Sequence, residues 1–211
     1  HCDTDGVAVR TIADSVALAD GPPENHAALE EDLDTLRRAH PGAIFRRYLG
    51  SIPQVAPSVF IAEGASVIGD VLLGTDVSVW YSTVLRGDVN RIEVRPRSNL
   101  QDGVVVHLGD RDPGLIEEDV VVGHRAVIHG CTIGAGCLIG IQSTVLDGAV
   151  IGEGSVIGSG ALVTAGTVIP SRSLVLGVPG KVVKKLGADD EVFHRKLAGK
   201  YMRLAHNYRV G

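Results

Sequence analysis

Three of the eight histidines, His107, His124 and His129, could together bind a metal ion. Three neutral imidazoles hold a divalent metal and leave one position open for water. The metal lowers the pKa of that water toward 7 and so supplies a hydroxide nucleophile. The alternative is that the three histidines are polar side chains at a wet subunit interface and bind no metal.

The region around these histidines repeats every six residues. A period of six fits neither a helix of period 3.6 nor an alternating strand of period 2. It predicts short strands joined by tight turns, with one inward aliphatic side chain per strand and glycine where a turn needs positive φ. Three strands form a triangular coil of about 18 residues, and about seven stacked coils fit between residues 55 and 180. A β-sandwich with coincidental spacing is the weaker alternative. The predicted inward residues are Ile61, Val67, Leu73, Val79, Leu85, Val94, Leu100, Val106, Val121, Val127, Ile133, Ile139, Val145, Ile151, Ile157, Val163, Ile169 and Val175.

The repeat predicts how the histidines lie relative to one another. His107 and His129 are 22 residues apart, and a loop in residues 108–114 shifts the repeat by three. Without this shift they lie nearly above each other on adjacent coils, about 4.8 Å apart, which is close enough to share a metal. His124 is five residues before His129 on the same coil, about 16 Å away along an extended chain. We therefore expect a trimer-interface site with two ligands from one chain and His124 from the next.

Helices are predicted on both sides of the repeat. Residues 1–45 form an N-terminal extension with a helix over about 23–40, residues 46–185 form the β-helix, and residues 186–211 form a helix packed on it. The C-terminal helix is expected to begin at Asp189-Asp190, since acidic residues suit a helix start. Its apolar stripe is predicted to be Val192, Leu197, Tyr201, Leu204 and Tyr208. The histidines outside the repeat, His1, His26, His40, His194 and His206, are expected to be solvated or to cap helices.

Charge and composition exclude several classes of protein. The formal net charge is −5 with no basic face, so no nucleic-acid partner is expected. No apolar run approaches the roughly 20 residues of a transmembrane helix, and no signal-peptide pattern is visible. The odd number of cysteines argues against a secreted disulfide framework and indicates a reducing compartment. Because the chain begins with His1, we expect it to be processed or trimmed.

A set of motifs closely resembles the γ-class carbonic anhydrase family. The motifs are Leu85-Arg86-Gly87-Asp88-Val89-Asn90, Ser98-Asn99-Leu100-Gln101-Asp102-Gly103, Val106-His107, Gly123-His124 and Ile128-His129-Gly130-Cys131. The resemblance covers about residues 46–185. It implies a left-handed β-helix and the reversible hydration of CO2 to bicarbonate at a Zn²⁺ ion, with Fe²⁺ or Co²⁺ also suited to three imidazoles and water.

The resemblance also implies roles for five polar residues. Gln101 would hydrogen-bond the metal-bound hydroxide, and Asn99 would position substrate or bicarbonate. Arg86 and Asp102 would form an ion pair that braces the subunit interface, with Asp88 in a similar supporting role. Purely structural pairing is an equal alternative for Arg86, Asp88 and Asp102.

The chain departs from the archetypal pattern at three places. Val89 replaces a glutamate, and Ile141-Gln142 stands where many relatives carry Met-Gly. Residues 108–114 are shorter than the acidic loop that supplies a proton shuttle, which leaves Asp110 or Asp112 as candidate proton carriers.

Other functions remain open from the sequence alone. Some members of this family form a trimeric module of mitochondrial respiratory complex I, so the chain could be a structural subunit of that complex with weak or no activity. The resemblance thus implies a trimer of the chain with itself or with close paralogues, in the mitochondrial matrix, there either free or at the inner membrane, or in the bacterial cytoplasm. A different metallohydrolase or an acyltransferase is a third class, since hexapeptide repeats also occur in acyltransferases.

Overall fold

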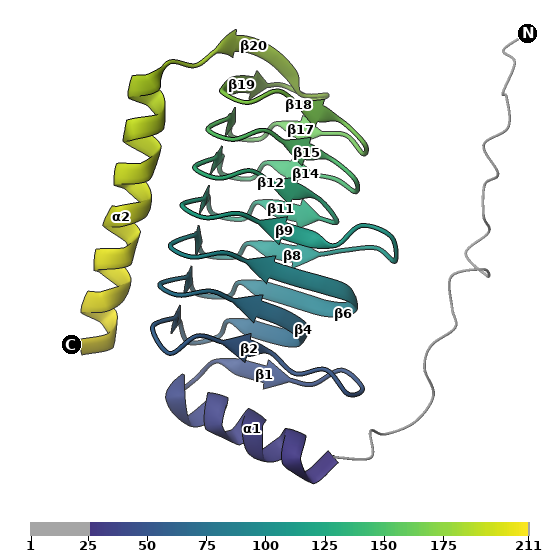
Figure 1. Cartoon of the computed structure of the whole chain (residues 1–211), viewed down its shortest axis with the longest axis vertical. Helices are drawn as coiled ribbons and strands as arrows, with labels where there is room; N and C mark the ends of the chain where they lie inside the picture. Colours follow the sequence, from purple (N-terminus) through teal and green to yellow (C-terminus); the bar gives the residue numbers. More distant parts are fainter. Residues whose placement is uncertain (1–25, 211) are drawn as a thin grey trace, which may run out of the picture.

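The computed structural model describes residues 26–210, which form a parallel β-solenoid of about seven turns with a helix at its N-terminal end and another along its flank (Figure 1). The helices are α1 (His26–Ala39) and α2 (Ala188–Val210). The strands are β1 (Ile44–Arg46), β2 (Gln54–Val55), β3 (Phe60–Ile61), β4 (Ser66–Leu73), β5 (Ser78–Val79), β6 (Val84–Val94), β7 (Asn99–Leu100), β8 (Val105–His107), β9 (Gly114–Ile116), β10 (Val121–Val122), β11 (Val127–His129), β12 (Thr132–Ile133), β13 (Leu138–Ile139), β14 (Thr144–Val145), β15 (Val150–Ile151), β16 (Val156–Ile157), β17 (Leu162–Val163), β18 (Val168–Ile169), β19 (Ser173–Leu176) and β20 (Lys181–Lys185).

Each strand pairs with the equivalent strand of the next coil. The register runs Ile133↔Ile151↔Ile169 on one flank, which is a step of one coil. All strand pairings within the series from β1 to β19 are parallel. Only the last strand, β20, pairs antiparallel, with β19. This stacking satisfies the backbone of every inner coil with its two neighbours and places equivalent side chains in columns.

The predicted aliphatic column fills the interior, with an error of one residue at two positions. Val122 and Ile128 point inward, whereas Val127 is half-buried on the outside and Val121 is buried on the side that α2 contacts. The shift arises because the 128-to-133 corner is one residue shorter than the six-residue period. The other sixteen predicted core residues are all buried.

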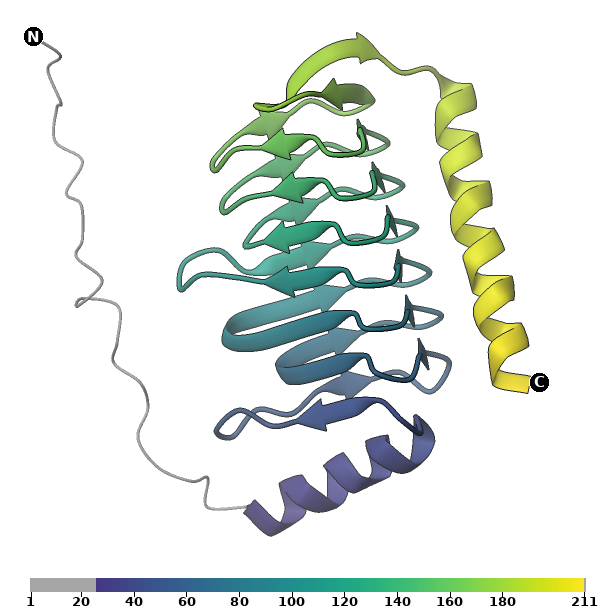
Figure 2. The same ribbon diagram turned by 180° about the vertical axis from the view of Figure 1, so that it is seen from behind.

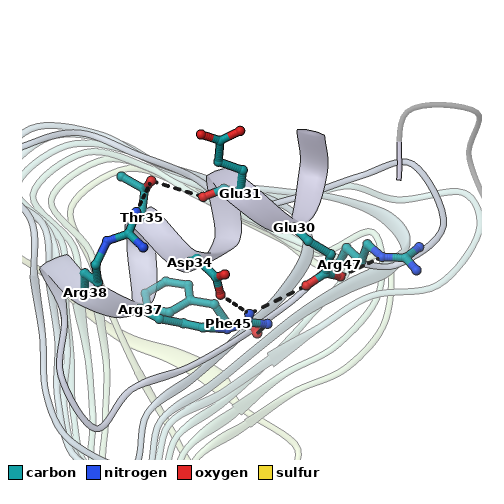
Figure 3. A network of polar contacts seen from close by, with 8 residues as sticks. All are labelled: Glu30, Glu31, Asp34, Thr35, Arg37, Arg38, Phe45 and Arg47. Atoms are coloured by element: carbon teal, nitrogen blue, oxygen red, sulfur yellow. Dashed lines mark hydrogen bonds and ion pairs between the residues drawn. The ribbon is translucent and has the colours of Figure 1, made fainter. Parts of the chain in front are cut away.

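Helix α1 closes the N-terminal end of the solenoid. Leu29 and Leu33 are buried on its inner side, and Leu33 joins the core cluster that contains Phe45. A polar network ties the helix to the first coil: Glu30 accepts from Arg47 at 3.0 Å, and Arg37 donates to the Phe45 carbonyl at 3.1 Å (Figure 3). The end of the core, which would otherwise meet water, is therefore capped.

Helix α2 lies along one flank of the solenoid, as Figure 2 shows from behind. The backbone N–H of Gly187 donates to Asp190, three residues on, which caps the helix start. Near its end, Ala205, Tyr201 and Leu204 pack on Phe60 and Trp80. The helix therefore covers the eight-stranded sheet that carries β7 and β10.

The side chains that α2 buries differ partly from the predicted stripe. Val192 and Tyr208 are 50% and 57% exposed, while Ala198 and Ala205 are buried. His194, expected to be solvated, is only 4% exposed. The Tyr208 ring, although exposed, still packs against Phe60 and Trp80, so the difference from the predicted stripe is only partial.

The predictions for residues 1–25, including His1 and Cys2, lie outside the described residues, as does the side chain of His26. Within the described range Cys131 and Cys137 are buried and unbridged, and burial raises the pKa of each thiol to about 12. No helix in residues 26–210 is long and apolar enough to cross a membrane.

Candidate metal centre

His107 and His129 face each other on adjacent coils, as their spacing predicts. They are register partners at the ends of β8 and β11. Nδ1 of His107 lies 3.2 Å from Nε2 of His129, and the rings meet edge to face. Two nitrogens on a tetrahedral zinc with bonds of 2.0–2.1 Å would lie about 3.3 Å apart. The separation of the pair therefore fits two ligands of one metal.

A carboxylate holds the outer nitrogen of each ring. Asp88 Oδ1 lies 3.1 Å from Nε2 of His107, and Asp147 Oδ1 lies 2.8 Å from Nδ1 of His129. Arg86 donates to the other oxygen of Asp88. Burial alone would raise the pKa of the Asp88 carboxyl, but the hydrogen bonds from Arg86 and His107 outweigh it and hold that pKa below its ordinary value.

This arrangement is suited to a cation between the two rings. The carboxylates favour a proton on each outer nitrogen, so the inner nitrogens of two neutral rings present lone pairs to each other. Two lone pairs at 3.2 Å repel unless a proton or a metal ion lies between them. Carboxylate–histidine contacts of this kind are the usual outer shell of metal-bound histidines. The residues present therefore fit a divalent metal.

His124 belongs to a second, separate group of side chains. It lies in the turn between β10 and β11, where its Nδ1 is 2.9 Å from Asp102 Oδ2. Both side chains are more than 40% exposed. Among residues 26–210, no group of three or more His, Cys, Asp or Glu side chains could hold a metal within one chain.

Gln101 and Asn99 lie beside this second group. Gln101 lines a cavity of about 370 Å³ together with His124 and with Tyr201 of α2. Gln101 Nε2 lies 3.4 Å from Asn99 Oδ1. Asn99 is only 1% exposed, and in the described part of the chain its Nδ2 has no hydrogen-bond partner. A buried amide donor without a partner is costly, so the Nδ2 of Asn99 is available to donate a hydrogen bond to a bound molecule.

Two residues of these groups were not predicted from the sequence. Asp147 could have been found, because it follows His129 by 18 residues, the nominal length of one coil. Tyr201 was assigned only to a packing stripe, and no spacing signal connects it with Gln101. Burial raises the pKa of its hydroxyl, and Asp102 adds to that rise.

The predicted ion pair between Arg86 and Asp102 is not formed within the chain, where Arg86 bonds Asp88 and Asp102 contacts His124. The two candidate proton carriers lie in the loop between β8 and β9. Asp110 is exposed, and Asp112 is half-buried with its carboxylate near Gly148.

Comparison with known proteins identifies the family. A probable carbonic anhydrase of Methanocaldococcus jannaschii is 52% identical over 151 residues, which is 72% of this chain and 95% of that protein. The mitochondrial gamma carbonic anhydrase 2 of Arabidopsis thaliana is 42% identical, over 72% of this chain and 57% of its own length. The chain belongs to the γ-class carbonic anhydrase family.

Two further comparisons concern the repeat that this γ-class carbonic anhydrase family shares with transferases. The family model for the bacterial transferase hexapeptide (six repeats) matches residues 130–165. A solved structure of a hexapeptide transferase family protein from Anaplasma phagocytophilum is 39% identical and superimposes with a TM-score of 0.75, over 78% of this chain and 98% of that one. Both agree with the solenoid.

Proposed function

We propose that the chain is a carbonic anhydrase that hydrates CO2 reversibly to bicarbonate at a metal site completed between the subunits of a homotrimer. The observation that carries the proposal is the facing pair of His107 and His129, whose inner nitrogens lie at the distance that two ligands of one metal require. A carboxylate holds the outer nitrogen of each ring. Relatives named carbonic anhydrase at 52% and 40% identity support the reaction class.

The assembly follows from the separation of the two groups of side chains. His107 and His129 supply two ligands from one chain, and His124 of a neighbouring chain supplies the third. A threefold arrangement completes three such sites at once, because each chain gives its His107–His129 pair to the site with one neighbour and its His124 to the site with the other. In such a trimer Arg86 would meet Asp102 of the neighbour, which is the interface ion pair the resemblance implies.

The metal would be Zn²⁺, with Fe²⁺ or Co²⁺ also compatible, and when bound it would make water acidic enough to supply hydroxide near neutral pH. The chain's own residues would do the rest. The Gln101 amide, in the same cavity as His124, would orient the water that attacks CO2. The unpaired Nδ2 of Asn99 would donate to a substrate or bicarbonate oxygen.

The alternative of a structural subunit of respiratory complex I is not favoured. A purely structural role would not need His107 and His129 to be braced by two carboxylates at hydrogen-bond distance. The acyltransferase alternative rests on the shared solenoid, which hosts several chemistries and does not itself indicate one.

The proposal is tested by metal content, assembly and CO2 hydration measured on the same preparation. We expect one metal per chain in an anaerobically purified trimer, hydration in stopped flow with a pH indicator, and loss of both metal and hydration in His107→Ala. Mixing His107→Ala with His124→Ala should restore part of the activity, because some mixed interfaces contain three intact ligands. An intact trimer without metal would contradict the proposal, and metal without hydration would favour the structural role.

A further inference from the structure

We propose that Asp147 is a positioning residue of the metal centre: it fixes the ring and the tautomer of His129 so that Nε2 faces the metal. The inference deepens the proposed function and rests on its metal site. The observation that carries it is the 2.8 Å contact between Asp147 Oδ1 and Nδ1 of His129.

The backbone places Asp147 in the coil above His129, one residue beyond the position in register with it, because β11 and β14 pair Val127 with Thr144 and Ile128 with Val145. It follows β14 by two residues, in the coil after the one that carries His129. The turn is pinned on both sides, because Gly148 N–H donates to the Gly130 carbonyl at 2.6 Å and Gly166 N–H donates to the Asp147 carbonyl at 2.8 Å. The carboxylate therefore leaves a fixed backbone.

Two glycines leave the space that the carboxylate occupies. A Cβ added at Gly130 would lie 2.5 Å from Asp147 Oδ1, and a Cβ added at Gly109 would lie 3.3 Å from the same atom. Gly130 directly follows His129 and has φ +51°, so it serves both the turn and the approach of the carboxylate. A side chain at Gly130 would force the Asp147 carboxylate to move, whereas one at Gly109 would displace it by a few tenths of an ångström.

The effect on the metal follows from the tautomer. With its proton held on Nδ1 by Asp147, His129 presents the lone pair of Nε2 toward His107. Asp88 does the same for His107 from the opposite side. Without Asp147 the ring can rotate and carry its proton on Nε2, and both changes weaken ligation. Outer-shell carboxylates typically contribute 10- to 100-fold in metal affinity. Because the Asp147 side chain is 42% exposed, the lower end of about 10-fold is expected.

The test is chelator competition for Zn²⁺ with the assembled protein. Asp147→Ala should weaken Zn²⁺ binding about 10-fold, and Asp147→Asn should restore part of that loss, since its amide oxygen still accepts from Nδ1–H. Asp112→Asn is the matched control, because it removes a nearby carboxylate that neighbours Gly148 and leaves the histidine contact intact. Unchanged affinity in Asp147→Ala, or an equal loss in Asp112→Asn, would overturn the inference.

A second measurement separates this inference from the proposed function. The ¹⁵N chemical shifts of the metal-free protein report the tautomer of His129 whether or not the protein binds metal. We expect the Nδ1–H tautomer in the wild type and a mixture in Asp147→Ala. Wild-type protein that binds no metal would refute the proposed function, whereas a His129 tautomer that Asp147→Ala leaves unchanged would refute the role of Asp147.

Discussion

Gly130→Ala separates the cost of a strained backbone from the cost of displacing Asp147. Gly130 has φ +51°, a conformation that costs an L-residue about 1–2 kcal/mol. An alanine Cβ at this position would also lie 2.5 Å from Asp147 Oδ1, which is too close for two atoms to remain in place. The end of an aspartate side chain moves easily, so we expect the carboxylate to yield and its contact with His129 to be lost.

Gly136 provides the matched control. Its φ is +65°, also in the left-handed region, and an added Cβ there would meet nothing within 4 Å. Both substitutions should therefore lower the free energy of unfolding of the metal-free protein by about 1 kcal/mol, part of the strain being offset by the stiffer unfolded chain. Only Gly130→Ala should weaken metal binding, by about 10-fold, which corresponds to about 1.4 kcal/mol.

The assay pairs urea unfolding in excess chelator with Zn²⁺ competition on the folded protein. The chelator is needed because bound metal would add its own stabilisation to the folded state. Equal Zn²⁺ affinities for Gly130→Ala and Gly136→Ala would refute the reasoning, since the clash with Asp147 would then have no effect on His129. A much larger loss of stability in Gly130→Ala would show that the backbone gives way in place of the carboxylate.

Three further predictions concern the fold. Ile133→Ala should lower the free energy of unfolding by about 3 kcal/mol in urea, because Ile133 is fully buried in the aliphatic column; a loss below about 1 kcal/mol would mean that the column collapses around the gap. In a Cys2→Ser background, Cys131 and Cys137 should react with a thiol reagent at pH 8 only after unfolding, since both are buried and the pKa of each is raised to about 12; rapid labelling of the native protein would contradict this. Burial and the nearby Arg209 lower the pKa of His40 from its ordinary value of 6.5. The free energy of unfolding should therefore fall as the pH drops below 6.5, and it should level off once the pH is below the lowered pKa of His40. His40→Gln should flatten this dependence in urea titrations between pH 7.5 and 5, and an unchanged slope would exclude His40 as its source.

The repeat shows where sequence reasoning succeeds and where it stops. Pairs such as Leu138-Ile139 and Val150-Ile151 also place two apolar residues side by side, and here the unbroken six-residue spacing, with a glycine directly after Ile139 and Ile151, correctly predicts that the second residue points inward. At Val121-Val122 and Val127-Ile128 the same spacing selects the first residue of each pair, which is wrong because the corner from Ile128 to Ile133 is one residue shorter than the repeat. Either member could point inward, and only the stacking of neighbouring coils decides between them.

For the candidate metal centre, the sequence determined whatever depends on register within the solenoid. The spacing of His107 and His129 placed them on adjacent coils, because a regular repeat converts distance along the chain into position in space. Membership of the γ-class carbonic anhydrase family could likewise be inferred from local motifs. The tertiary structure alone decided the contacts that depend on side-chain direction and on α2: Asp147 against His129, Tyr201 in the cavity with Gln101, and the burial of His194. A repeat fixes where each backbone segment lies, but which side chains meet depends on the packing of corners and of a helix that lies outside the repeat.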